Sequence, residues 1–362
     1  MRLIIYVEPT SYLLPLWREI SAQSQVDTRL VFLEENLTQA WNIDLNNDSR
    51  VEVLRGSRGK KIMRLWQLLK DPRTELVNLA GWGRPLLLAA LLLAWLRGIP
   101  VCVESDTQFD PSTSWWRRTL KRLLLPLLFR IPRLFFPAGS RQADYFKRYG
   151  VPASRIRIIQ MTVDVRAIET HVMRMRRGLG EQQPVGDREC VFLYVGRLED
   201  YKGILDLLNA FAGLGQERCR LLIVGDGSLQ ARVIDATRKH PNIEFLGRLS
   251  GDELWRAYAR AHVFVLPSLS ESWGLVINEA MAAGLAIIAT DRVGSVDDLV
   301  NEGGNGLVVP AGSPESLTKA MQNLARQTDL IAEMGQRSRE IITNWTIEDE
   351  ARILMASWDK MQ

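Results

Sequence analysis

The chain has 362 residues, a length typical of two domains and sufficient to bury a sizeable core in each. With 46% apolar and 24% charged residues the composition is ordinary for a globular protein, and a formal net charge of +4 neither establishes nor excludes an anionic partner. Three widely spaced cysteines, Cys102, Cys190 and Cys219, argue against a disulfide framework or a four-cysteine zinc site and fit reduced thiols in the cytoplasm.

The start of the chain, RLIIYV, has no long apolar core or cleavage site, so it is predicted to be a first strand. The longest apolar run, Pro85–Leu96, is shorter than the ~18 residues expected of a membrane-spanning helix. We therefore expect a buried helix there, in a protein that is soluble or bound to a membrane surface.

Short apolar runs alternate with helix-length segments from end to end, which indicates an α/β fold. Amphipathic helices are expected at Ile204–Phe211 and Pro314–Leu324, the second capped by Ser313. Near-continuous apolarity predicts strands buried on both faces of parallel sheets. The strands are predicted at 2–7, 28–33, 75–80, 99–104, 133–138 and 155–160 in the first half, and at 191–196, 220–225, 243–247, 263–268, 285–290 and 306–311 in the second.

The alternation breaks at 170–190, a charged stretch without periodicity that we interpret as the connection between two doubly wound domains. Residues 1–168 are predicted to form the first domain and 169–345 the second, with a helix at about 346–362 packing back on the first. In open α/β sheets ligands bind beyond the carboxyl ends of strands, so function is sought there.

Two loops of the second domain combine glycine with charge. Gly196 allows a tight turn, and Arg197 and Lys202 near a helix start form an anion site suited to a diphosphate, although a solvated basic turn remains an alternative. In GDGSL, Gly225 and Gly227 let backbone amides approach a ligand, but the dinucleotide-binding fingerprint is not met.

The stretch SESWGLVINEA, 270–280, carries two glutamates around a predicted helix start at Gly274. Free amides there favour a phosphate, and Glu279, one turn inside, leans toward the same end. Glu271 enters from the loop, and each carboxylate can grip a vicinal diol. One acid would hold the ribose and the other the sugar; compensation of the helix dipole is the alternative.

In this order, YVGRLEDYKG, VGDGSL, FLGRLS and PSLSESWGLVINEAMAAGLAIIAT resemble the carboxyl-terminal half of the retaining glycosyltransferases of family 4. The resemblance is dense over Val191–Leu324, including NEGGNGLVVPAGSPESL, and looser before it, where ASRIRIIQMTVDV resembles the strand leading into the hinge. It implies the GT-B fold, with two Rossmann-like domains facing a central cleft.

The resemblance also implies roles for individual residues. Arg197 and Lys202 would bind the donor diphosphate, Glu279 the ribose and Glu271 the transferred sugar. Leu246, Gly247 and Arg248 would lie near the base. The remaining donor-binding positions implied are Gly196, Gly225, Gly227, Ser270, Trp273, Gly274 and Leu275.

The reaction implied is metal-independent transfer of a hexosyl group from a nucleoside-diphosphate sugar, with retention, and no cofactor is expected. The sequence has no Asp-x-Asp. It departs from the family pattern in two places. The loop VEPTSYLLP lacks the usual Gly-Gly, and VESDTQFD lacks the usual histidine, so Glu104 or Asp106 would stand near the reacting carbon. Ordinary solvated acids of a surface loop are the alternative.

The acceptor is expected on the first domain, with Trp82 of AGWGRP stacking on a sugar ring unless that loop is a plain turn. Between Pro111 and Ala143 there are seven basic residues and no acidic one, interleaved with tryptophans and leucines. This pattern, centred on 115–133 and echoed at Arg55–Lys70, predicts binding to an anionic membrane surface, for instance the cytoplasmic face of the inner membrane. A domain-packing helix with a solvated basic rim is the alternative.

The predicted function is therefore a retaining glycosyltransferase that acts on a glycan or a lipid-linked saccharide in cell-surface polysaccharide, lipopolysaccharide or glycolipid synthesis. The alternatives are an inverting GT-B transferase with Asp106 as base, or a nucleotide-sugar epimerase. A nucleic-acid-binding protein is a more remote one, because it leaves the charged strand ends unexplained, and no nucleic-acid partner is expected. A glycoside hydrolase using Glu271 and Glu279 would leave the phosphate-binding features without a role.

Overall fold

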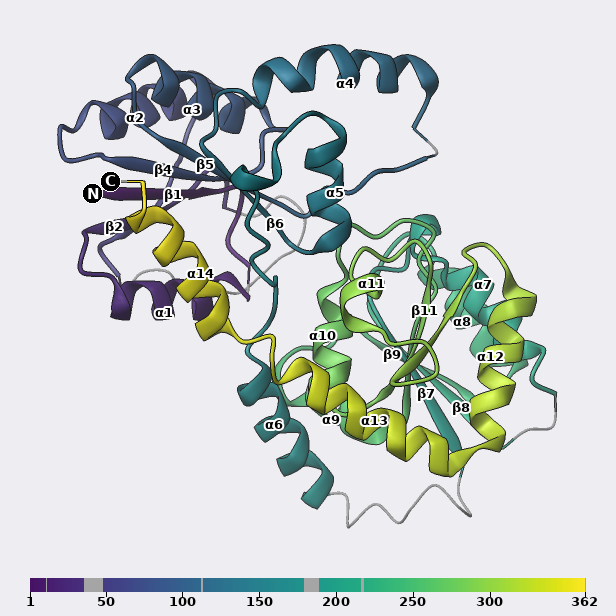
Figure 1. Ribbon diagram of the computed structural model, residues 1–362. Coiled ribbons are helices and arrows are strands. Elements are labelled where there is room, and N and C mark those ends of the chain that lie inside the picture. The colour runs from purple at the N-terminus through teal and green to yellow at the C-terminus, as the bar shows by residue number, and fades with distance from the viewer. Residues whose placement is uncertain (11, 36–47, 112, 179–188, 216–217, 362) are drawn as a thin grey trace. The chain divides into compact units, whose positions relative to one another are not determined.

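The protein is described by a computed structural model covering residues 1–10, 12–35, 48–111, 113–178, 189–215 and 218–361 (Figure 1). The chain divides into two compact units. Unit 1 comprises Met1–Met161 together with Ile347–Gln362, and unit 2 comprises Thr162–Thr346. The predicted α/β class is confirmed, because each unit is built on a parallel sheet covered by helices.

The described part of unit 1 contains a six-stranded parallel sheet of order β3-β2-β1-β4-β5-β6. Its strands are β1 (Arg2–Tyr6), β2 (Thr28–Phe32), β3 (Val51–Val53), β4 (Leu76–Ala80), β5 (Val101–Ser105) and β6 (Leu134–Pro137). Its helices are α1 (Leu13–Gln23), α2 (Arg58–Lys70), α3 (Pro85–Leu96), α4 (Trp115–Leu128), α5 (Ser140–Arg148) and α14 (Ile347–Asp359). Because the chain runs outward from β1 in one direction and then from β4 in the other, the order reverses between these two strands.

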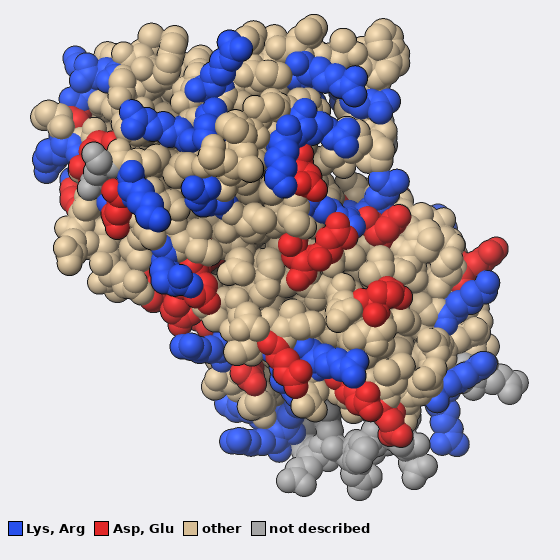
Figure 2. Space-filling model, viewed as in Figure 1, with Lys and Arg blue, Asp and Glu red and all other residues tan. Residues whose placement is uncertain are grey.

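Helix α4 lies on the surface of unit 1 with little of its own apolar surface covered. Leu125 is buried, whereas Trp115 and Leu123 are 74% and 65% exposed. Where Figure 1 places this helix, Figure 2 shows Lys and Arg side chains standing among uncharged ones. The helix thus carries exposed apolar and basic side chains together.

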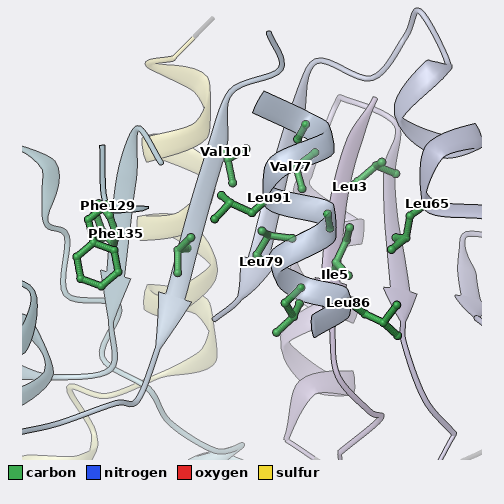
Figure 3. Packing of buried hydrophobic residues seen from close by; sticks show 14 of the residues in the cluster. Leu3, Ile5, Leu65, Val77, Leu79, Leu86, Leu91, Val101, Phe129 and Phe135 are labelled. Carbon is green, nitrogen blue, oxygen red and sulfur yellow. The ribbon is translucent and has the colours of Figure 1, made fainter. Parts of the chain in front are cut away.

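The core of unit 1 lies on both faces of its sheet. Leu3 and Ile5 point to one cluster, beneath α3, and Ile4 points to the other. Figure 3 shows the first cluster, in which Leu86 and Leu91 of α3 face the strand side chains. Burial on both faces explains why the strand sequences are continuously apolar.

The second cluster joins the two ends of the chain. Leu13, Leu16, Trp17 and Ile20 of α1 pack with Ile347, Ala351, Leu354 and Trp358 of α14. The two helices lie side by side (Figure 1). The carboxyl-terminal helix is therefore part of the core of unit 1.

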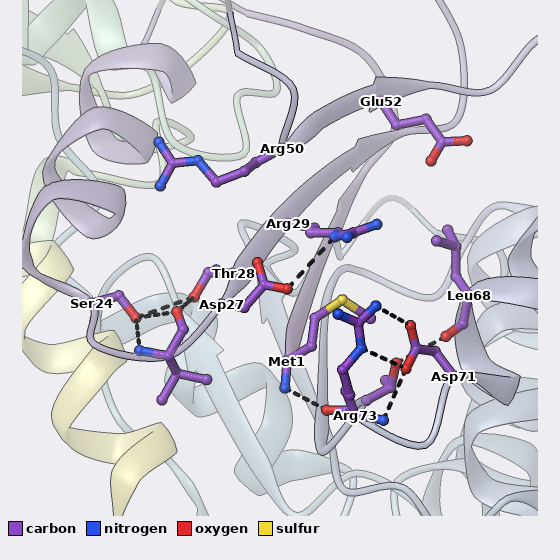
Figure 4. Close-up of polar contacts among 12 residues, drawn as sticks. Met1, Ser24, Asp27, Thr28, Arg29, Arg50, Glu52, Leu68, Asp71 and Arg73 are labelled. Carbon is purple, nitrogen blue, oxygen red and sulfur yellow. Dashed lines mark hydrogen bonds and ion pairs between the residues drawn. The ribbon is translucent and has the colours of Figure 1, made fainter.

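The amino ends of the unit 1 strands carry short-range polar contacts. Asp71 accepts hydrogen bonds from the backbone and guanidinium of Arg73, and Asp27 pairs with Arg29 (Figure 4). Partners two residues apart stabilise turns and strand starts rather than forming a binding site.

The described part of unit 2 holds a second six-stranded parallel sheet, of order β12-β11-β10-β7-β8-β9. Its strands are β7 (Cys190–Val195), β8 (Cys219–Val224), β9 (Ile243–Gly247), β10 (Val263–Leu266), β11 (Ala286–Thr290) and β12 (Gly306–Val309). Its helices are α6 (Val165–Gly178), α7 (Ile204–Ala212), α8 (Gln230–Lys239), α9 (Gly251–Arg260), α10 (Leu275–Ala282), α11 (Val296–Leu299), α12 (Pro314–Arg326) and α13 (Thr328–Ile342). Here the order reverses between β7 and β10.

Three sequence predictions about elements were wrong. Residues 155–160 form no regular strand. Arg155 ends a 3-10 turn, and the residues after it follow the edge strand β6 through the Ile156–Phe135 bridge and through hydrogen bonds from the Arg157 and Ile159 amides. The short edge strand β3 was not predicted. The stretch interpreted as an irregular connection continues α6 as far as Gly178, and 179–188 lie outside the described residues.

Candidate functional site

In unit 2 the predicted donor residues gather at the carboxyl edge of the sheet, around the point where strand order reverses. The segment after β7 holds Gly196, Arg197 and Lys202, and the segment after β10 holds Ser270 and Glu271. These segments are joined by backbone hydrogen bonds, from the Leu269 and Ser270 amides to the carbonyl of Tyr201, at 2.8 and 3.3 Å. Ligands bind at such reversal points in doubly wound sheets.

The loops after β7 and β8 approach so closely that only glycine fits between them. A Cβ on Gly225, whose φ is 144°, would stand 1.8 Å from the carbonyl oxygen of Gly196. The same loop is tied to β9 by a 2.8 Å hydrogen bond from the Gly225 amide to the carbonyl of Gly247. A Cβ on Gly227 would likewise stand 2.6 Å from the carbonyl oxygen of Leu198. The predicted glycines thus bring three strand ends together.

Lys202 and Glu271 form an ion pair, and each side chain is 14% exposed. Lys202 closes a 3-10 turn, Asp200–Lys202, and is followed by Gly203, whose left-handed φ of 68° starts α7. The hydroxyl of Ser268 also approaches Glu271, at 3.4 Å. The structure therefore places a cation and a carboxylate, both predicted, in direct contact at the sheet edge.

Arg197 is exposed and lies over the ring of Tyr201, with its guanidinium carbon 5.4 Å from the ring centre. The Tyr194 hydroxyl donates to the backbone carbonyl of Arg197, at 2.7 Å, which fixes the loop. Arg248 stands after β9 and pairs with Asp226 at 3.7 Å, while Leu246 lies within β9. The exposed guanidinium groups keep hydrogen-bonding capacity for an anion.

Helix α10 begins as predicted, directly after Gly274. This glycine has a φ of 94°, and a Cβ there would meet Leu266, Val293 and Glu271 within 3.2 to 3.3 Å. A left-handed residue in so tight a place favours glycine. The first amides of the helix, beginning with Leu275, lack intrahelical partners by geometry and are suited to an anion.

Glu279, one turn inside α10, is partly buried and accepts a 2.7 Å hydrogen bond from the hydroxyl of Tyr258 on α9. Burial raises the pKa of Glu279 from 4.5 to about 7, and the hydrogen bond from Tyr258 opposes this rise. The carboxyl group is therefore close to half ionised at neutral pH.

Trp273 is held inside unit 2. Its side chain is 2% exposed, its ring centre lies 5.6 Å from that of Trp345, and its indole donates to Asn278 at 3.3 Å. Its side chain thus braces the start of α10. Ser270, by contrast, is exposed.

Sequence reasoning missed Tyr201, Tyr258 and Ser268. Tyr201 stands between the two cations of the loop after β7, its ring within 5.6 Å of the Lys202 ammonium. Its position beside Lys202 is the one signal that could have pointed to it. Tyr258 lies on another helix from Glu279, so no local pattern marks it.

Unit 1 has a cavity of about 620 Å³ at the carboxyl ends of β1, β4, β5 and β6, which includes its own strand-order reversal. The two predicted acceptor-side residues, Trp82 and Glu104, line this cavity, and so does Asp106, which was predicted as a catalytic candidate. Small-molecule sites typically measure roughly 300–1,000 Å³, so the volume is appropriate for a ligand.

Glu104 sits at the end of β5 and accepts hydrogen bonds from the hydroxyl of Tyr6 and the side-chain amide of Asn78. Burial raises its pKa, and the two hydrogen bonds act in the opposite direction. Trp82 is packed against Phe129 and Tyr145, at ring distances of 4.9 and 6.2 Å, so its orientation is fixed.

Each of the two units contains a stretch of sequence that matches a known protein family. Residues 16–162 match the glycosyl transferase 4-like domain, and residues 179–341 match the family described as glycosyl transferases group 1. The chain belongs to the group 1 glycosyltransferases. As such a member it has the GT-B fold, as predicted from the sequence motifs.

The curated relatives of this group 1 chain have names that refer to different transferase activities. Sulfoquinovosyl transferase SQD2 of Arabidopsis thaliana is 27% identical over 263 residues, covering 69% of this chain and 50% of the relative. The D-inositol 3-phosphate glycosyltransferase of Corynebacterium efficiens is 30% identical over 223 residues, covering 56% of this chain and 50% of the relative. The chain spans about half the length of such relatives.

Among solved structures, Anabaena HepE in complex with UDP superposes with a TM-score of 0.80 at 17% identity, covering 99% of this chain and 100% of that one. At this identity the likeness concerns the fold. In the group 1 chain, none of the described helices is long and apolar enough to span a bilayer.

Proposed function

We propose that this group 1 chain is a retaining glycosyltransferase that moves a sugar from a nucleoside-diphosphate sugar to a hydroxyl of a glycan or a lipid-linked saccharide. The observation that carries the proposal is the Lys202–Glu271 ion pair at the strand-order reversal of unit 2, followed along the chain by α10, which carries Glu279. The UDP of HepE, a protein of the same fold, supports a nucleotide donor. Cell-surface polysaccharide or glycolipid synthesis is the process we infer.

The charges suit a leaving diphosphate. Arg197 and Lys202 would neutralise the negative charge that develops on it, together with the first amides of α10. Because Lys202 already touches Glu271, a bound donor would lie against both, with its sugar hydroxyls on Glu271 and its ribose on Glu279. The protein contributes position and charge rather than a covalent step.

The donor assignment is tested with purified protein and a panel of UDP-, GDP- and dTDP-sugars, followed by slow donor hydrolysis and by transfer to lipid-linked acceptors. We expect one donor to be used, and Lys202→Ala and Arg197→Ala each to lose about 10²-fold or more in turnover. Lys319→Ala, an exposed cation on α12, is the control. Unchanged turnover in either loop variant would contradict the assignment.

Retention is the finer part of the proposal. In a retaining reaction the departing phosphate oxygen takes the acceptor proton on the same face of the sugar. An inverting reaction instead needs a base from unit 1, for which Asp106 is exposed and lines the cavity. Proton NMR of the first product formed separates the two, because an anomeric configuration opposite to that of the donor excludes retention.

We further propose that α4 holds the protein on an anionic membrane surface at the cytoplasmic face. Its exposed tryptophans and leucines stand among arginines, and Arg117 lies over the Trp116 ring at 5.1 Å. Apolar side chains that enter the headgroup region, with cations beside them, bind anionic lipids. Sedimentation with phosphatidylglycerol vesicles should show binding that weakens with salt, and phosphatidylcholine vesicles are the control. Equal sedimentation with both would argue against it.

A further inference from the structure

The cavity of unit 1 carries more acid than its sequence motifs suggest. Four acidic and two basic residues line it. Glu8, Glu104 and Glu350 are only 9%, 7% and 4% exposed, and they arrive from three separate segments: the loop after β1, the end of β5, and α14. Asp106 adds a fourth carboxyl group that is exposed.

Two of these carboxyl groups, Glu104 and Glu350, raise the pKa of the same two tyrosines. Burial, together with the charges of Asp106, Glu350 and Glu104, raises the pKa of Tyr12 to about 12, although a hydrogen bond with Thr10 opposes the rise. The pKa of Tyr6 is raised by burial and then by Glu104 and Glu350. The polar wall of the cavity is therefore a set of acceptor oxygens and two tyrosine hydroxyls that stay protonated.

The cations of the cavity are less deeply placed than the acids. Arg84 is exposed, and Lys121 is partly exposed and lies 5.9 Å from the centre of the Tyr145 ring. A negatively charged ligand group deep in the cavity would meet buried carboxyl groups, and like charges brought together in a desolvated site oppose binding. The charge arrangement selects against anions there.

Apolar side chains form much of the remaining wall. Leu13, Leu16, Leu87 and Leu125 line it, together with the rings of Trp82 and Tyr145. A sugar ring has faces of C–H groups and an edge of hydroxyls, so it matches a cavity with one apolar wall and one wall of hydrogen-bond acceptors.

We propose that this cavity binds an uncharged, hydroxyl-rich group of the acceptor, a neutral glycosyl unit, and excludes a group that carries phosphate or carboxylate at that position. This rests on the proposed transferase function, and it defines the acceptor class. Glu104 and Glu350 accept hydrogen bonds from the sugar hydroxyls, and the leucines and Trp82 cover its C–H face.

The test compares two probes that differ by one carboxylate, octyl β-D-glucopyranoside and octyl β-D-glucuronide. Calorimetric titration of the full chain is run at pH 8, well above the ordinary pKa of a carboxyl group, and at low salt, where charges are little screened. We expect the glucoside to bind at least ten times more tightly. Equal or tighter binding of the glucuronide, or no binding of the glucoside, would overturn the proposal.

Variants show whether the discrimination comes from the cavity acids. Glu104→Gln and Glu350→Gln keep the side-chain size, and the double variant should reduce the ratio of the two affinities at least threefold. Glu348→Gln, on the same helix as Glu350 but outside the cavity wall, should leave the ratio unchanged. A folded double variant with the wild-type ratio would refute the assignment of these acids.

Failure of the transferase function would be visible separately. UDP and GDP binding and donor hydrolysis, measured on the same preparations, report on unit 2 and do not depend on which glycoside enters the cavity. A protein that binds no UDP or GDP but prefers the glucoside as expected would contradict the transferase function. A protein that binds and hydrolyses a donor but lacks the preference for the glucoside would contradict the cavity assignment.

Discussion

Glu279 is the residue whose chemistry depends most on its surroundings. Burial brings the pKa of its carboxyl group to about 7. The ionised form presents two acceptor oxygens to the hydroxyls of a ribose diol, whereas protonation turns one of these oxygens into a hydroxyl donor. Since ionisation rises with pH across 7, the KM for the donor should fall between pH 6 and pH 8 in steady-state assays, and Glu279→Gln should abolish this dependence. A donor KM that is flat over this range in the wild type would contradict the assignment.

The same group also affects stability, with a definite sign. Between pH 4.5 and about 7 the folded chain keeps a proton on Glu279 that the unfolded chain has released. The contribution of this group to the free energy of unfolding therefore decreases as pH rises through that window. Donor binding, which favours the ionised form, works against this loss.

Tyr258 sets how far the Glu279 pKa rises. Tyr258→Phe removes the hydrogen bond that stabilises the ionised carboxylate, which contributes about 1.5–3 kcal/mol for a charged acceptor, so the KM profile should move up by about one to two pH units. Trp255→Phe, which changes the ring 5.8 Å from Tyr258 without touching that bond, is the control. A profile unmoved in Tyr258→Phe would show that the bond has no such effect.

The sequence could identify side chains that act through their own loop. Lys202, Glu271, Gly274 and Glu279 stand within short motifs, so residue type and spacing were enough to select them as candidates, and their roles stay predictions. Trp273 was predicted as a donor-binding position, but its burial against Trp345 was beyond such reasoning. Tyr258 was missed because its partner, Glu279, lies on a different helix.

Among the elements, the contact between the loops after β7 and β8 depends most on a missing side chain. Gly225→Ala would press a Cβ onto the Gly196 carbonyl oxygen, 1.8 Å away, and this oxygen is a backbone atom that cannot rotate aside as a flexible side chain would. Overpacking costs about 1–3 kcal/mol, and left-handed strain adds about 1–2 kcal/mol. Urea unfolding should show that loss, with weakened donor binding.

The matched variant is Gly303→Ala. Gly303 also has a left-handed φ, 71°, but a Cβ there would meet nothing within 4 Å. Gly303→Ala should lower the free energy of unfolding only by the left-handed backbone strain, about 1–2 kcal/mol, and should leave the affinity for the donor unchanged. If both variants lost the same stability and bound donor equally well, the close approach of Gly225 to the Gly196 carbonyl would contribute neither to stability nor to donor binding.

Strand prediction succeeded where apolar runs are buried on both faces and failed at the margins. β3 has three residues, pairs with β2 alone among the described strands and is half-buried, so its sequence carries little apolar signal. The run 155–160 is apolar enough for a strand, but it starts as a 3-10 turn and ends at Gln160, whose φ is 58°. A left-handed non-glycine residue interrupts extended backbone, and local composition does not reveal it.

For the molecule as a whole, the return of the chain to unit 1 has an energetic consequence. Trp358 of α14 is fully buried in the core shared with α1. Trp358→Ala should destabilise unit 1 by about 3–5 kcal/mol, since it removes a large buried ring and leaves a cavity. Trp95→Ala, at a site 55% exposed, should cost far less in the same urea unfolding experiment. Similar losses in the two variants would mean that α14 contributes little to the core.

In the whole molecule, the groups available to neutralise the charge of a bound diphosphate lie together in unit 2. Arg197, Lys202 and the amides at the start of α10 supply positive charge at one sheet edge, and the sequence contains no Asp-x-Asp. We therefore predict that these groups neutralise the leaving group without a divalent cation. Transfer should therefore be unchanged by EDTA, and Mn²⁺ should not restore activity to Lys202→Ala. Activity that is lost on chelation and regained with Mn²⁺ would show that the protein side chains are not sufficient.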